Sequence, residues 1–187
     1  MPTARTTYLA GSTGQWRIDG ITSVAGEGLP DAARIDIVEG PLAQESSGTV
    51  WALRGLTSNI RYTTRAELTV LAERQEGLGR PQCTRAALIP IRKAESWWTL
   101  AQDERRALLA ESHITIGLEY LPGVARRLHH SRDLGEPFDF LTWFEYAPED
   151  SEQFEDLLGR LRNTAEWSHV DREVDVRLSR DVSGETS

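Results

Sequence analysis

The sequence has very few sulfur-containing residues and no long apolar run. Its 187 residues include one methionine and one cysteine, Cys83. A single cysteine excludes an intrachain disulfide and any zinc site built from cysteine ligands. Residues 1–20 lack the apolar core of a signal peptide, and no stretch of roughly 18 apolar residues could span a membrane. We therefore expect a cytoplasmic protein without a membrane partner, although a processed precursor would have the same sequence.

Basic residues are also too few for a nucleic-acid surface. The chain has 21 Lys and Arg against 29 Asp and Glu, which gives a formal net charge of −8. Neutralising phosphates requires clustered Lys and Arg, so nucleic acid is not an expected partner. An anionic substrate would gain no long-range attraction from such a chain. Anion chemistry would need a local cation, such as a buried arginine.

Several short catalytic motifs are absent too. The sequence has no glycine-rich phosphate loop, no Gly-x-Ser-x-Gly, no His-Glu-x-x-His and no EF-hand loop. Their absence argues against a kinase, a serine hydrolase and a zinc protease. What remains is the composition of an ordinary globular protein, 39% hydrophobic and 27% charged, with the length of one large domain or two small ones.

Apolar periodicity predicts alternating strands and helices. The segments that read as strands are 15–24, 49–57, 86–92, 138–146 and 170–178. Those that read as helices are 63–75, 100–111 and 151–162, with 116–130 partly helical and interrupted at Pro122. Residues 25–48 read as a loop with one edge strand, and Pro90 predicts a bulge or an exposed end in its strand. This order indicates an α+β fold.

A few polar and aromatic residues are candidates for a site, and each also has an ordinary structural explanation. His113 is a lone histidine that could ligate a metal, and Glu166 could accept a hydrogen bond from its ring or be solvated at a helix end. Arg126 and Arg127 could hold an anion or form a polar helix face. The pair at 97–98, both tryptophan, could flank a flat cofactor or pack in the core. His129 and His130, adjacent on a helix, would point apart and make a poor metal site.

Six segments have more specific amino-acid sequences. They are 53–62 (LRGLTSNIRY), 77–80 (GLGR), 86–93 (AALIPIRK), 97–98 (WW), 120–122 (YLP) and 132–146 (RDLGEPFDFLTWFEY). In this order and spacing, the stretch 51–180 resembles a short-chain member of the chlorite dismutase family. Residues 1–50 match less clearly.

The resemblance implies a fold, a cofactor and an activity. The fold is a dimeric α+β barrel built from two ferredoxin-like halves, 1–100 (shortened) and 101–187 (haem-binding), with antiparallel sheets and helices packed outside. The cofactor is haem b, which must be held non-covalently because Cys83 is the only cysteine. The activity is decomposition of chlorite to chloride and dioxygen. A homodimer is expected, since a shortened N-terminal half would leave barrel edges that need covering.

The resemblance also assigns roles to individual residues. His113 matches the proximal ligand of the haem iron, and Glu166 matches its hydrogen-bond partner. Arg126 matches the distal catalytic arginine, which retains hypochlorite until the O–O bond forms. Gln75 is a candidate to hold that arginine in one orientation. The other matches are residues at the haem propionates and edge, namely Asn59, Ile60, Tyr62, Lys93 and Trp97, and two of the distal wall, Thr142 and Phe144.

Two other functions remain open for such a fold. A coproheme decarboxylase shares it, but typically has an uncharged polar residue in place of the distal arginine and a longer chain. A non-catalytic haem-binding stress protein would need neither chlorite nor the arginine. Arg126 and the chain length favour the dismutase.

Overall fold

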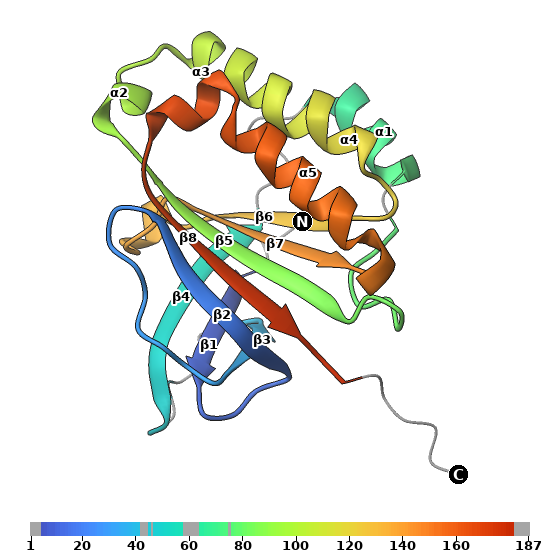
Figure 1. Ribbon diagram of the computed structural model, residues 1–187. Coiled ribbons are helices and arrows are strands. Elements are labelled where there is room, and N and C mark those ends of the chain that lie inside the picture. The colour runs from blue at the N-terminus through green and yellow to red at the C-terminus, as the bar shows by residue number, and fades with distance from the viewer. Residues whose placement is uncertain (1–4, 42–44, 46, 58–63, 75, 182–187) are drawn as a thin grey trace.

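Eight antiparallel strands form a closed barrel in the computed structural model, which describes residues 5–41, 45, 47–57, 64–74 and 76–181 (Figure 1). The strands are β1 (Arg5–Gly11), β2 (Trp16–Ala25), β3 (Arg34–Glu39), β4 (Thr49–Thr57), β5 (Arg85–Lys93), β6 (Ala125–His130), β7 (Phe140–Tyr146) and β8 (Val170–Ser179). Around the barrel they follow the order β1-β3-β2-β8-β5-β7-β6-β4, and β4 pairs with β1 to close it.

The same strand order occurs in both halves of the barrel. The first four strands are arranged β4-β1-β3-β2 and the last four β8-β5-β7-β6, joined where β2 meets β8 and β4 meets β6. Because both joints are paired, we find no open edge among the described strands, and the expectation of uncovered barrel edges was wrong. The division of the chain at residue 100 stays a prediction, and in the strand order β5, which ends at Lys93, groups with the last four strands.

The longer helices of the described residues lie on one side of the barrel, and short helical turns complete the set (Figure 1). They are α1 (Arg65–Arg74), α2 (Glu95–Trp98), α3 (Gln102–Leu109), the π-helix η1 (Ala110–Ile116), α4 (Gly117–Glu119), α5 (Ser151–Arg162) and the short 3-10 turns η2 (Arg132–Leu134), η3 (Pro148–Asp150) and η4 (Ala165–His169). Figure 1 shows α3, α4 and α5 over the outer face of β5 to β8, with β1 to β4 on the opposite side. No helix in the described part of the chain combines the length and the apolar content that a membrane-spanning segment requires.

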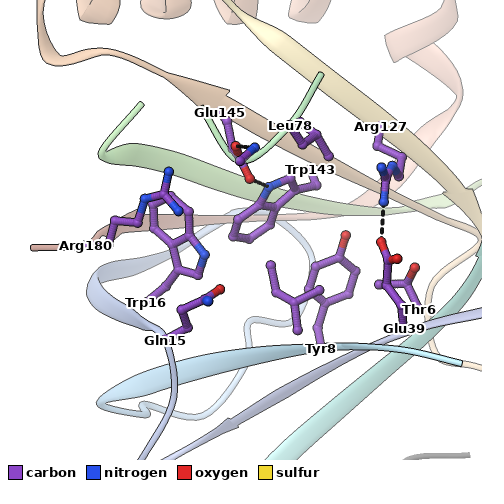
Figure 2. Close-up of a pocket in the computed structure, with 12 residues that line it drawn as sticks. Thr6, Tyr8, Gln15, Trp16, Glu39, Leu78, Arg127, Trp143, Glu145 and Arg180 are labelled. Atoms are coloured by element: carbon purple, nitrogen blue, oxygen red, sulfur yellow. Dashed lines mark hydrogen bonds and ion pairs between the residues drawn. The ribbon is translucent and has the colours of Figure 1, made fainter. Parts of the chain in front are cut away.

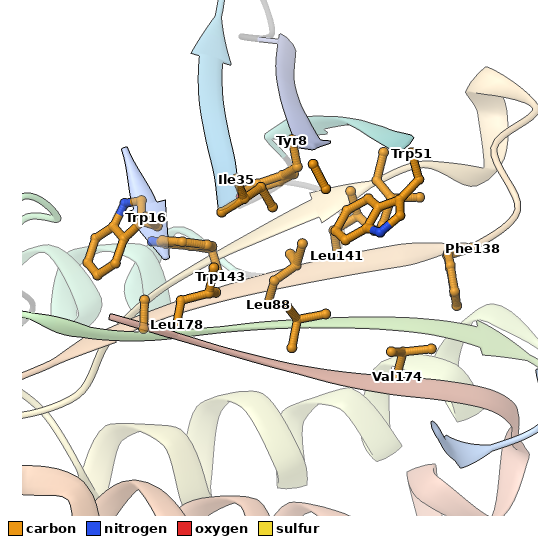
Figure 3. Packing of buried hydrophobic residues seen from close by; sticks show 14 residues of the cluster. Tyr8, Trp16, Ile35, Trp51, Leu88, Phe138, Leu141, Trp143, Val174 and Leu178 are labelled. Atoms are coloured by element: carbon orange, nitrogen blue, oxygen red, sulfur yellow. The ribbon is translucent and has the colours of Figure 1, made fainter. Parts of the chain in front are cut away.

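The sheet β5–β7–β8 therefore separates two apolar cores. Side chains inside the barrel, such as Leu88, Trp143 and Val176, pack against Tyr8 and Leu53 from the N-terminal strands (Figure 3). Alternate residues of the same strands face the helices, where Ile89, Phe144 and Tyr146 pack on α5 through Phe154 and Leu157. Burial of both faces explains the almost uninterrupted apolar sequence of β5 and β7.

Three strands differ from the sequence predictions. Strand β3, expected within 25–48 as an edge strand, pairs with both β1 and β2. Residues 125–130 form β6 rather than a helix, and its alternating side chains follow the strand period. Its pairing with β4 and β7, which lie far away in the sequence, decides this conformation. His129 and His130 consequently point to opposite faces. Strand β1 was not predicted at all, because its buried Thr6 and Thr7 conceal the apolar alternation.

The expected bulge at Pro90 was also wrong. Pro90 is buried and lies opposite Leu141 in an unshifted register between β5 and β7. The ladder between β5 and β8 has no recorded pair at Ile89 or Pro90, and its register shifts only after Arg92. A proline has no N–H to donate, so it is tolerated at this interruption of the ladder without a bulge.

Candidate functional site

The helix-facing side of β6 and β7 gathers three of the predicted residues. Arg126 lies opposite Phe144 in the β6–β7 register, and Thr142 lies two residues along β7, on the same face. Thr142 and Phe144 are both buried. The sheet thus presents one cation beside a small polar group and an aromatic ring, beneath the helical layer.

Gly117 makes room for the Arg126 side chain. A Cβ atom at Gly117 would lie 1.9 Å from Nη1 of Arg126, so the guanidinium rests against the first residue of α4. This Nη1 atom is inaccessible to solvent. Burial lowers the pKa of Arg126 to about 10, and the charge of Glu166 acts in the opposite direction. The guanidinium therefore remains protonated at neutral pH in a desolvated position.

Glu166 forms a buried ion pair at the end of β5. Its Oε1 accepts a hydrogen bond from Lys93 Nζ at 2.6 Å, and both side chains are at most 1% exposed. The Lys93 ammonium also lies over the Trp97 ring, 4.3 Å from the centroid. Burial lowers the pKa of Lys93, while the Glu166 carboxylate raises it. Each charge of the pair depends on the other, since a lone buried charge would be costly.

The second oxygen of Glu166 reaches the π-helix that contains His113. Oε2 accepts a hydrogen bond from Ser112 Oγ, one residue before His113. Turns of π-helix are rare and occur often at functional sites. Of His113 the structure describes the backbone, within η1, and not the side chain. The structure therefore places the Glu166 carboxylate against the helix that contains His113, and the hydrogen bond between Glu166 and His113 stays a prediction.

A second polar network fixes the turn that carries Glu166. Glu173 on β8 accepts a hydrogen bond from Trp167 Nε1 at 2.8 Å and another from Arg162 Nε at 2.8 Å. Trp167 follows Glu166 in η4, and Arg162 ends α5. The orientation of the Glu166 carboxylate is thus supported by β8 as well as by Lys93.

The remaining predicted residues are placed unequally. Asn59, Ile60, Tyr62 and Gln75 lie outside the described residues. Trp97 is fully buried under Lys93. We expected Lys93 at a haem propionate, but the structure pairs its ammonium with Glu166 instead. A propionate contact by Lys93 would require this buried pair to break.

Two residues of the site had not been predicted. Ser112 belongs to no sequence motif, and only its hydrogen bond to Glu166 shows that it is part of the site. Gly117 had a weak signal, because a glycine within a helical segment costs stability and often marks a close approach. Among the described residues, no group of three or more His, Cys, Asp or Glu side chains could hold a metal ion directly.

Comparison with known proteins gives one family model and several similar solved structures. A family model described as chlorite dismutase matches residues 43–182. A crystal structure of a dimeric chlorite dismutase from Nitrobacter winogradskyi is 52% identical, with a TM-score of 0.85, and the match covers 94% of this chain and 99% of that chain.

More distant solved structures share the fold. Chlorite dismutase from Candidatus Nitrospira defluvii in complex with imidazole is 21% identical with a TM-score of 0.64, over 96% of this chain and 92% of that chain. A mutant of that enzyme in complex with cyanide is 19% identical with a TM-score of 0.64, over 97% and 93%. At this identity the likeness concerns the architecture alone.

Proposed function

Because the chain belongs to the chlorite dismutase family, we propose that it is a haem b enzyme that decomposes chlorite to chloride and dioxygen. One observation carries the proposal. Arg126, a desolvated cation, shares a sheet face with Thr142 and Phe144, opposite the helical layer that contains His113 and Glu166. An acidic chain needs such a local cation to attract an anionic substrate.

The residues of the helical layer and of the facing sheet have the chemistry that a haem requires. A histidine that ligates iron is normally oriented by a hydrogen bond to its other ring nitrogen. The ionised Glu166, held beside η1 by Ser112 and Lys93, is suited to accept that bond from His113. When bound, haem would supply a redox-active iron that coordinates chlorite. We assign Trp97, Asn59, Ile60 and Tyr62 to the edge of the haem.

Lys93 takes a different role from the one that the resemblance implied. Its ammonium stabilises the ionised form of Glu166 at 2.6 Å. A carboxylate kept ionised in this way is a stronger acceptor for the His113 N–H. We therefore place Lys93 in the support of the proximal histidine rather than at a propionate.

Arg126 would act on the substrate side. Its guanidinium, protonated well above neutral pH, attracts chlorite and then retains hypochlorite by charge and hydrogen bonding until dioxygen forms. Thr142 and Phe144 would form a wall that excludes water and limits escape of the hypochlorite. Gln75 is assigned to hold Arg126 in its productive orientation.

The finer points of architecture belong to the same proposal. We assign the repeated strand order to two ferredoxin-like halves, and we assign the protein a homodimeric state, as in the relative from Nitrobacter winogradskyi. We place the enzyme in the cytoplasm.

The decisive experiment measures oxygen release after chlorite is added to haem-loaded protein. We expect a Soret band typical of high-spin ferric haem and sustained oxygen production. His113→Ala should lose the haem or its five-coordinate spectrum, and normal haem binding by this variant would refute the proximal assignment. Absence of oxygen, together with decarboxylation of coproheme in the presence of peroxide, would favour the decarboxylase.

Adjacent arginines provide a matched pair of variants. Arg126→Ala should keep the haem but shorten the period of oxygen production, because hypochlorite would escape. Arg127→Ala removes the same charge from the opposite face of β6, where Arg127 pairs with Glu39 at 2.5 Å. It should retain sustained production. Equal turnover lifetimes in the two variants would refute the role of Arg126.

A further inference from the structure

Two oxidisable side chains inside the barrel each contact a buried proton acceptor. The Tyr8 hydroxyl lies 3.0 Å from His129 Nε2, and Trp143 Nε1 donates to Glu145 Oε1 at 2.9 Å. The rings of Tyr8 and Trp143 are stacked, with centroids 5.6 Å apart. All four side chains are buried. A phenol or an indole loses an electron more easily when a neighbouring base accepts its proton.

The state of His129 suits this role. Burial lowers the pKa of His129 to about 3, so its imidazole is neutral at physiological pH. Burial also raises the pKa of Tyr8, which keeps the phenol protonated. We assign the tautomer in which Tyr8 donates to Nε2, because a protonated phenol at 3.0 Å from a neutral imidazole can donate its O–H to the unprotonated ring nitrogen.

These residues lie directly behind the proposed haem face. Trp143 is flanked in β7 by Thr142 and Phe144, which point to the helix side, and it lies opposite Arg127 in the register. One layer of sheet therefore separates the Trp143 ring from the helix-side face that carries Arg126. Electron transfer requires no opening in this layer.

A cavity of about 320 Å³ is lined in part by Tyr8 and Trp143, on the barrel side of the sheet. Figure 2 shows Tyr8, Trp16 and Trp143 lining it, with the dashed bonds from Trp143 to Glu145 and from Arg127 to Glu39. The mouths of β-barrels are common sites for small molecules. A planar organic molecule in this cavity would contact the Tyr8 ring.

We propose that Trp143 and Tyr8 form a redox relay, which carries oxidising equivalents from the haem site to Tyr8, where a small phenol or enediol bound in the barrel cavity removes them. The proposal rests on the proposed haem function for its oxidant, an oxychlorine species or a peroxide acting at the haem. It assigns to the barrel interior a protective activity separate from oxygen release.

Charge gives the relay a direction. Trp143 and Trp16 are in ring contact, with centroids 5.4 Å apart, but their surroundings differ in sign. The anionic Glu145 stabilises an oxidised Trp143, whereas the Arg180 guanidinium, 4.7 Å above the Trp16 ring, disfavours an indole cation there. Oxidation therefore passes from Trp143 to Tyr8 and not to Trp16.

The electrons and protons balance in three steps. The oxidant takes one electron from Trp143, whose Nε1 proton shifts toward Glu145. Tyr8 then gives an electron to Trp143 and its phenolic proton to His129, while Glu145 returns the indole proton. Finally the reductant in the cavity gives one electron to the Tyr8 radical and releases a proton to water, and His129 returns the phenolic proton.

The test uses electron paramagnetic resonance on haem-loaded protein that is mixed with peracetic acid and frozen within milliseconds. Ring-deuterated tyrosine identifies a tyrosyl signal by its altered hyperfine structure. We expect a tyrosyl radical that is lost in Tyr8→Phe, which keeps the ring and its stacking. Tyr146→Phe is the matched control, because Tyr146 is buried on the helix side and its hydroxyl is bonded to Arg177 rather than to a base.

Three results would overturn the relay: no tyrosyl radical in the parent protein, an undiminished signal in Tyr8→Phe, or loss of the signal in Tyr146→Phe. His129→Gln adds a second check, since an amide can bond to the phenol but cannot take its proton. The tyrosyl yield should fall in this variant although Tyr8 is present. An unchanged yield would contradict the proton transfer.

A haem-independent measurement separates this inference from the proposed function. Azide radicals generated by pulse radiolysis oxidise tryptophans in the full chain without haem. We expect the tryptophanyl absorption to decay as tyrosyl absorption rises, with loss of this transfer in Tyr8→Phe. Transfer without chlorite turnover would leave the relay intact and refute the dismutase. Turnover without transfer would refute the relay.

Discussion

The two halves of the barrel have the same strand order but different surroundings. Strands β5 to β8 have helices inserted between β5 and β6 and between β7 and β8, whereas short segments without helices connect β1 to β2 and β2 to β3. Every predicted site residue within the described part of the chain lies in or beside the helix-bearing half. The strands alone suffice to close the barrel. A buried site between a sheet and a second layer also requires helices that cover the sheet.

Breaking the ion pair in the helix-bearing half should have the largest effect on stability. Lys93→Met leaves the Glu166 charge buried without its partner, which should cost about 3–5 kcal/mol of unfolding free energy. In the other half, Arg17→Met breaks a pair with Asp19 whose arginine is 60% exposed, and should cost at most about 1 kcal/mol. Urea denaturation measures both. Similar costs would contradict the contrast between the halves.

Truncating one leucine in each core tests whether the halves are energetically joined. Leu53→Ala opens a cavity in the barrel core, and Leu157→Ala opens one under α5. Each should cost about 2–5 kcal/mol, within a single transition seen alike by far-ultraviolet circular dichroism and tryptophan fluorescence. A separate early transition in Leu53→Ala would show that the N-terminal strands unfold independently.

The Tyr8–His129 contact connects the halves and should make their stability sensitive to acid. The folded-state pKa of His129, about 3, lies below the ordinary value of 6.5 for histidine. Between these values the unfolded chain binds a proton at His129 that the folded chain does not bind. The stabilisation is complete above pH 6.5 and is lost progressively as the pH falls toward 3. Within this window the slope is about 1.4 kcal/mol per pH unit. His129→Gln should remove this part of the slope in denaturation curves, and an identical slope would contradict a neutral His129.

Gly117→Ala should have the smallest effect on stability and a specific effect on function. The new methyl group displaces only the flexible end of Arg126, so the unfolding free energy should change by less than about 1 kcal/mol. Oxygen production from chlorite should nevertheless end sooner. Gly159→Ala, in α5 with open space around its Cβ, is the control and should leave production unchanged. Equal behaviour of the two variants would show that the position of Arg126 against α4 is unimportant.

The sequence was informative where local periodicity and tertiary environment agree. Helix α5 has the bounds that were predicted, and β7 and β8 lie where strands were predicted, in segments whose apolar residues are buried. The family resemblance is confirmed by the match over residues 43–182 and by the 52% identical structure. The amino-acid sequences of the six segments, rather than any single residue, made that prediction possible.

The remaining features depend on contacts between distant residues. Closure of the barrel depends on β4 meeting β6, and nothing local in residues 125–130 distinguishes a strand from a helix. The partner of Lys93 is 73 residues away, so a propionate and a carboxylate of the protein were equally compatible with its position. Ser112 and Gly117 became visible only when Glu166 and Arg126 were placed beside them.

The two joints between the halves are unequal in extent. Strand β2 pairs with β8 from Arg17 opposite Ser179 to Ala25 opposite Glu173, whereas the described pairing of β4 with β6 is confined to Leu56 with His130 and Thr57 with His129. Thermal opening should therefore begin where the described ladders are shortest, between β4 and β6 and between β2 and β3, which have two residue pairs each. Amide hydrogen exchange should be fast at the β4–β6 joint and slowest where β8 lies between β2 and β5.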